Sequence, residues 1–143
     1  MVRAGVDRLD VVLNDRCMAA TRRVDPHELR AALESMRDWV SGEGAEPPRA
    51  EVARAVRLSL HLLSELAPGR TVEVRVPPHA AVQCVAGPRH TRGTPPNVIE
   101  LDARTWLGLA MGADSWSAAV QRGALRASGQ RADVSAWLPL VRL

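Results

Sequence analysis

The sequence predicts a single α+β domain. Residues 71–78 alternate cleanly between apolar and polar side chains, which predicts a half-buried strand, and 80–87 is predicted as its hairpin partner after the Pro77–Pro78 turn. Further strands are predicted at 97–102 and 124–129. The predicted helices are segregated from an apparent strand hairpin rather than placed between every pair of strands, which is typical of α+β folds and not of doubly wound sheets. The chain has 143 residues, of which 46% are apolar, and this is enough for one hydrophobic core.

The first helix is predicted to start at Asp25–Pro26 and to end near Gly42. Aspartate is a favoured N-cap residue and proline fits the first helical position. Apolar residues then recur at helical spacing: Leu29, Leu33, Met36 and Val40. A linker over 42–48 leads to a second helix, 49–67, with one apolar face, which ends before Pro68–Gly69.

The C-terminal third is predicted to hold two short helices, a strand and a tail. Asp102 is the expected N-cap of a helix that ends at Gly112, and Asp114 the expected N-cap of a helix that ends at Gly123. Residues 131–141 are expected to form a short helix or an extended tail.

We divide the chain into three parts. Residues 1–22 form a poorly patterned N-terminal extension, of which 1–17 are expected to be dispensable because they have no consistent hydrophobic period. Residues 23–46 form the N-terminal helix and linker, and residues 47–143 form the main domain.

Composition argues against several function classes. The net charge is +3 and all 19 basic residues are arginine, but they form no concentrated patch, so no specific nucleic-acid partner is expected. No apolar run is long enough to span a membrane and the N-terminus lacks a secretory apolar core, so we expect a cytoplasmic protein. Cys17 and Cys84 are expected to be unpaired, and no motif predicts a metal or a cofactor.

The segment from Glu100 to Val141 resembles the C-terminal half of the sterol carrier protein family. The shared pattern is an acidic residue at a strand end, an aromatic-Leu-x-Leu-Ala-x-Gly helix, a Gly-x-Leu-x-x-x-Gly strand and a closing apolar segment. It is carried here by Asp102, Trp106, Leu107, Leu109, Ala110, Gly112, Ala119, Gly123, Leu125, Gly129, Leu138 and Leu140. Together with the stretch 72–98, the chain is similar to the bacterial branch of this family. The resemblance implies a mixed or antiparallel sheet of about four to five strands covered by helices, here with an added N-terminal helix. It also implies an apolar tunnel between sheet and helices for a fatty acyl chain, a sterol or a similar lipid.

A tunnel of this kind needs apolar side chains that face a common space. The same residues would also form an ordinary close-packed core, and the sequence leaves both interpretations open. The candidate lining residues are Val72, Val74, Val76, Val82, Cys84, Ile99, Leu101, Trp106, Leu107, Leu109, Met111, Trp116, Val120, Leu125 and Leu138.

The proline-rich loop at 87–96 allows three interpretations. Arg89, His90 and Arg92 could hold the carboxylate or phosphate headgroup of a ligand, or His90 could act as a general base with an arginine as anion clamp. In the third interpretation the loop is a stiff connection whose arginines pair with acids such as Glu73 or Glu100.

The sequence therefore favours a non-catalytic carrier of a lipid-like small molecule. One alternative is an accessory or regulatory domain that acts on a partner enzyme, and a protein partner or a homodimer would fit it. A second alternative is a small hydrolase or isomerase that uses His90.

Overall fold

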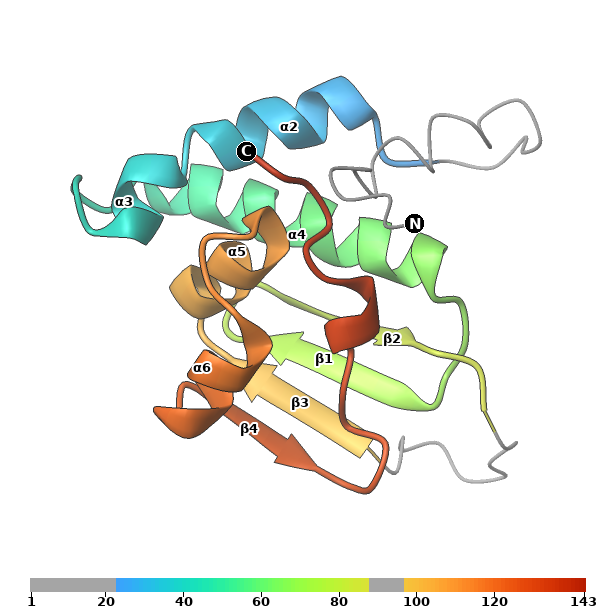
Figure 1. Cartoon of the computed structure of the whole chain (residues 1–143). Helices are drawn as coiled ribbons and strands as arrows, with labels where there is room; N and C mark the ends of the chain where they lie inside the picture. Colours follow the sequence, from blue (N-terminus) through green and yellow to red (C-terminus); the bar gives the residue numbers. More distant parts are fainter. Residues whose placement is uncertain (1–22, 88–96) are drawn as a thin grey trace, which may run out of the picture.

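The computed structural model describes residues 23–87 and 97–143, and in this part of the chain four strands form one sheet beneath a set of helices (Figure 1). The elements in chain order are α2 (Pro26–Glu34), α3 (Arg37–Ser41), α4 (Arg49–Leu66), β1 (Val72–Val76), β2 (Ala80–Cys84), β3 (Asn97–Leu101), α5 (Ala103–Met111), α6 (Trp116–Gln121), β4 (Leu125–Ser128) and the short 3-10 helix η2 (Ser135–Trp137). The predicted α+β class is confirmed. Residues 1–22, the predicted N-terminal extension, and residues 88–96 of the proline-rich loop lie outside the described part.

The sheet is mixed, with the strand order β2-β1-β3-β4. The pairs β1–β2 and β3–β4 are antiparallel, and the central pair β1–β3 is parallel. In this register Val74 lies opposite Val82 on one side and Ile99 on the other, so apolar side chains of three strands share one face.

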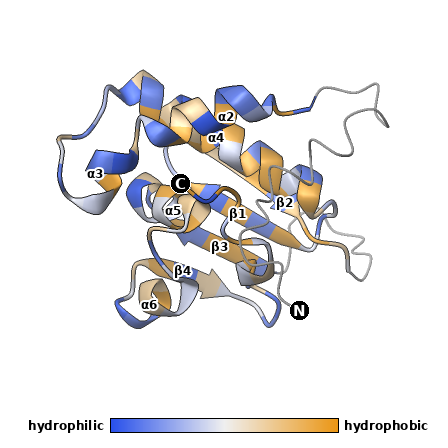
Figure 2. Cartoon of the chain, turned by 45° about the horizontal axis from the view of Figure 1, so that its top comes forward, coloured by the Kyte–Doolittle hydropathy of each residue, from blue (hydrophilic) through white to orange (hydrophobic). Residues whose placement is uncertain are grey.

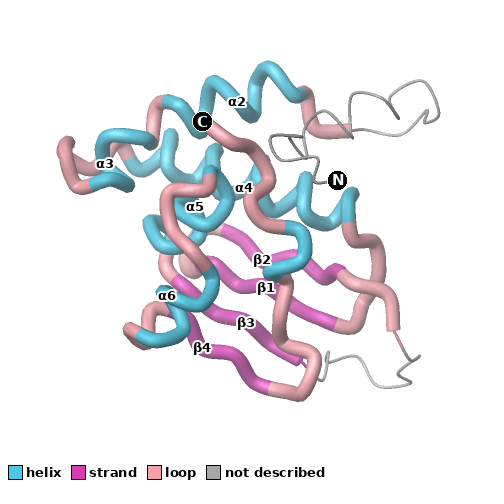
Figure 3. The backbone as a smooth tube through the Cα atoms, viewed as in Figure 1, coloured by secondary structure: helices cyan, strands magenta, loops and turns pink. Residues whose placement is uncertain are grey.

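Helices α4 and α5 cover that apolar face of the sheet (Figures 1 and 3). The long helix α4 presents one buried stripe to the interior, as its apolar spacing predicts. That stripe consists of Val52, Ala55, Val56, Ser59, Leu60, Leu62 and Leu63. Helix α2 packs on α4, and its Leu29 and Leu33 belong to the same hydrophobic cluster as the sheet. Colouring by hydropathy shows orange and blue alternating along the strands and helices, as half-buried elements require (Figure 2).

The N-terminal helix differs from the prediction because it is broken. Asp25 caps α2 as expected and accepts hydrogen bonds from the backbone N–H groups of His27 and Glu28. The helix ends at Glu34, where the Ser35 hydroxyl donates to the carbonyl oxygen of Ala32 at 2.8 Å and competes with the helical ladder. A separate helix, α3, then ends at Ser41, and Gly42, with a φ of 85°, gives the expected left-handed C-cap.

The second correction concerns the start of α6. Asp102 caps α5 as predicted, since its carboxylate accepts from the N–H of Thr105 at 2.7 Å. The N-cap of α6 is Ser115 and not Asp114, because the Ser115 hydroxyl accepts from the N–H of Ala118. Asp114 instead forms an ion pair with Arg122 across the helix.

The C-terminal segment returns to the helices after β4. The N–H groups of Leu140 and Val141 both donate to the carbonyl oxygen of Ala110, at 2.8 and 3.0 Å. Both side chains are fully buried, so this segment, which the sequence placed as a short helix or tail, forms part of the core.

Candidate functional site

The predicted tunnel residues lie mostly in one apolar layer between the sheet and helices α4 and α5. Eleven of them are buried: Val72, Val74, Val76, Cys84, Ile99, Leu101, Trp106, Leu107, Leu109, Met111 and Leu125. Val82, Trp116 and Leu138 are half-buried and pack against the same cluster. This arrangement agrees with both a ligand-lining surface and a close-packed core.

Val120 does not belong to this layer. Its side chain is 48% exposed, so it faces the surface, and we remove it from the candidate lining. The reason lies in the short helix α6, in which Ala119 is the only buried residue.

Trp106 anchors α5 to α4 at the centre of the layer. Its side chain is 0% exposed, and its indole N–H donates to the Ser59 hydroxyl at 2.8 Å. Ser59 in turn donates to the carbonyl oxygen of Ala55 at 2.7 Å. The polar atoms of both side chains are therefore satisfied inside the layer, which leaves the surrounding surface apolar.

Cys84 is a free, buried thiol at the end of β2. Burial raises its pKa to about 11, because the apolar surroundings disfavour the thiolate. At neutral pH Cys84 therefore acts as a small apolar side chain of the layer and not as a nucleophile.

Arg89, His90 and Arg92 lie outside the described residues, but the two ends of their loop are fixed. Cys84 and Asn97 lie on opposite sides of Val72 in the sheet, so the chain leaves β2 and enters β3 on the two sides of the start of β1. The Asn97 amide is buried, donates to the Thr71 carbonyl at 2.9 Å and accepts from the Arg131 N–H at 2.8 Å. The acid proposed as a partner of the loop, Glu73, forms an ion pair with Arg75 at 2.6 Å.

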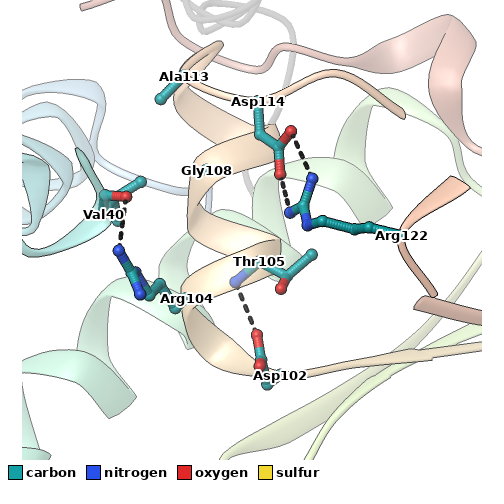
Figure 4. Close-up of a pocket in the computed structure, with 8 residues that line it drawn as sticks. All are labelled: Val40, Asp102, Arg104, Thr105, Gly108, Ala113, Asp114 and Arg122. Atoms are coloured by element: carbon teal, nitrogen blue, oxygen red, sulfur yellow. Dashed lines mark hydrogen bonds and ion pairs between the residues drawn. The ribbon is translucent and has the colours of Figure 1, made fainter. Parts of the chain in front are cut away.

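A polar pocket lies beside α5, and none of the tunnel candidates lines it. Figure 4 shows the residues that line this pocket. Its volume is roughly 410 Å³, in the range of small-ligand sites. It is lined by Val40, Asp102, Arg104, Thr105, Gly108, Ala113, Asp114 and Arg122. None of these residues was predicted to line a site.

The charged side chains of this pocket alternate in sign and are each held by a structural contact. Arg122 binds both carboxylate oxygens of Asp114, and this hydrogen bonding is the main cause that lowers the pKa of Asp114. Arg104 donates to the Val40 carbonyl at the end of α3, at 3.5 Å. From the sequence, Asp102 and Asp114 were predicted as helix N-caps and not as residues of a site. The signal that could have indicated the ion pair was an Asp before a short helix and an Arg after it.

A second, shallower pocket lies at the turn between β1 and β2. It is lined by Arg75, Pro77, Pro78, His79, Ala80 and Ala81. Neither this pocket nor the polar one is lined by a predicted tunnel residue.

Within residues 23–87 and 97–143, no group of three or more His, Cys, Asp or Glu side chains is placed to hold a metal ion. No helix in the same ranges is both long and apolar enough to cross a bilayer.

Comparison with known proteins matches most of the folded chain to one family. Residues 48–140 match the family described as bacterial SCP ortholog, where SCP denotes sterol carrier protein. No curated protein matches the chain. The matched range starts at the N-cap of α4 and ends in the C-terminal segment, so it contains the whole sheet and the helices that cover it. The chain therefore belongs to the bacterial sterol carrier protein-like family.

Proposed function

We propose that the protein is a carrier that binds an apolar or amphipathic small molecule between the sheet and helices α4 and α5. The observation that carries the proposal is the continuous apolar face of three strands under two helices, in a chain of the sterol carrier family. A fatty acyl chain or a sterol-like molecule is the ligand class that fits such a surface.

The small number of buried polar side chains supports an apolar ligand. Among the described residues the buried polar side chains are Ser59, Thr71, Asn97 and Thr105, and none of these carries a charge. Ser59 and Asn97 already have hydrogen-bond partners within the protein. A ligand in the layer would meet hydrocarbon on most sides and would gain about 0.8 kcal/mol per buried CH₂ group.

Ligand entry requires part of the cover to move, because the lining residues of β1 are fully buried. We propose the segment 138–143 as the movable wall. Its two backbone hydrogen bonds to α5 converge on one carbonyl, that of Ala110, so their loss would release the segment from α5 in one step. Leu140 and Val141 would then leave apolar space that an alkyl chain can fill.

Native mass spectrometry of the gently purified protein tests this proposal. We expect a species heavier than the polypeptide, which loses the extra mass under denaturing conditions and yields a lipid on organic extraction. A preparation that shows only the polypeptide, and that also takes up no fatty acid of any chain length on incubation, would contradict the carrier proposal.

A further inference from the structure

The polar pocket beside α5 combines a defined shape with charged side chains whose hydrogen-bonding capacity is only partly used within the protein. It is bounded by the end of α3, by α5 and by the turn that precedes α6, so three elements fix its shape. Gly108 forms part of its wall: a Cβ atom there would lie 3.3 Å from the Cβ of Asp114 and 3.4 Å from Cγ1 of Val40. The missing side chain lets these neighbours approach α5 closely.

The charges around the pocket are balanced in number and alternate in space. In the view of Figure 4, Arg104 lies to the left of α5 and Arg122 to its right, while Asp114 lies near the top of the pocket and Asp102 near its bottom. A purely anionic ligand would be repelled by the two carboxylates, and a purely cationic ligand by the two guanidinium groups. A ligand with both charges can pair favourably with each.

The structural contacts also leave bonding capacity free. Asp102 uses one carboxylate oxygen to cap α5, and its second oxygen accepts no hydrogen bond from the described residues. Arg104 makes a single long contact to the Val40 carbonyl, so most of its donors are unused within the described chain. Because each side chain is already held by one partner, a ligand would order few new rotamers on binding.

We propose that this pocket binds a small zwitterion, a molecule with one anionic group and one ammonium group. Arg104 takes the anionic group and Asp102 takes the ammonium group, while the Asp114–Arg122 pair keeps the far wall in place. The proposal does not depend on lipid binding in the apolar layer, because none of the candidate lining residues of that layer lines the pocket.

A titration of the full chain with ω-amino acids tests this site. The probes are glycine, β-alanine, γ-aminobutyrate and δ-aminovalerate, followed through the amide NMR signals of Gly108, Ala113 and Asp114. We expect saturable shifts with an affinity optimum at one chain length. Butyrate and butylammonium, which each carry one of the two charges, should bind at least about tenfold more weakly than the best zwitterion.

Two variants assign the roles, and two matched variants control for net charge. Asp102→Asn keeps an N-cap residue but removes the charge, and Arg104→Gln keeps a donor but removes the charge. Each should weaken binding of the best zwitterion by about fivefold or more, whereas Glu51→Gln and Arg57→Gln on the exposed side of α4 should not. Equal binding of butyrate, butylammonium and the zwitterions would overturn the proposal. So would the absence of a saturable shift with every probe, since the pocket would then be a water-filled junction between helices.

Discussion

The two faces of the sheet differ sharply although their residues alternate along the same strands. On the covered face Val74 and Ile99 are paired neighbours and fully buried, while one residue further along Arg75 and Glu100 are paired on the open face and only half-buried. The open face continues to Arg126, which pairs with Glu100 from β4. We therefore expect stability and the proposed ligand binding to depend on the covered face, and the open face to contribute little to either.

Removal of the central anchor of the covered face should have the largest effect. Trp106→Ala deletes a fully buried side chain and leaves Ser59 without its indole donor, so we expect a loss of about 3–5 kcal/mol in the free energy of unfolding, measured by urea titration. Trp106→Phe keeps most of the volume and should lose less. A loss below about 1 kcal/mol for the alanine variant would show that the layer is loosely packed at this point.

Two adjacent residues of β3 compare the faces directly. Ile99→Ala should cost about 2–5 kcal/mol, because it opens a cavity in the apolar layer. Glu100→Ala on the open face should change the unfolding free energy by about 1 kcal/mol or less. Similar losses for both variants would mean that the open face is also covered, for example by a second copy of the chain, and sedimentation velocity would reveal that copy.

The buried thiol of the covered face should make stability fall at high pH. The pKa of Cys84 is raised from 9.0 to about 11, so the folded state holds this proton more tightly than the unfolded state does. The stabilisation is present in full below pH 9.0 and is lost as the pH rises to about 11, by an amount on the order of 2 kcal/mol.

The composition of the chain limits the number of other groups that titrate in this alkaline range. The chain has no tyrosine and no lysine, so few other side chains titrate in that range. A Cys17→Ser background removes the second thiol, and Cys84→Ala in that background should abolish the slope. A slope that survives Cys84→Ala would assign it to another group.

The smallest effect is expected at the ion pair near α6. Arg122 lowers the pKa of Asp114 below its usual 3.8, so the unfolded state binds this proton more readily. The resulting stabilisation is present above pH 3.8 and is lost as the pH falls through the lower folded value. Asp114→Asn should flatten the acid limb of the stability curve slightly, and added salt should have a similar effect on the parent protein because the Arg122 side chain of the pair is exposed. An unchanged acid limb would show that the pair contributes no stability.

Local patterns in the sequence were sufficient for most elements of the fold. All four strands were predicted, β1 from its alternation and β2 as the hairpin partner of β1, and the caps at Asp25 and Asp102 marked two helix starts. The resemblance to the sterol carrier family supplied the mixed sheet, because the parallel pairing of β1 with β3 joins segments more than twenty residues apart and leaves no local trace. The break at Ser35 and the exchange of Asp114 for Ser115 as N-cap depend on single side-chain hydrogen bonds that compete with equally good alternatives.

The candidate sites were less predictable than the fold. Periodicity identified the covered face, but it cannot separate a ligand-lining surface from a packed core, since both require the same buried residues. The polar pocket was missed because its walls come from segments as far apart as Val40 and Arg122, each of which has an ordinary structural role in its own segment.

The most direct test of the carrier proposal is to locate an added fatty acid by methyl NMR. Val74 and Val98 are matched valines in paired strands, one on the covered face and one on the open face. We expect the methyl signals of Val74 and Ile99 to shift saturably, those of Val98 to stay unchanged, and the affinity to rise about fourfold for each added CH₂ group, as the transfer free energy requires. Shifts confined to Val98, or no saturable shift at any chain length, would contradict the proposal that the covered face binds the ligand.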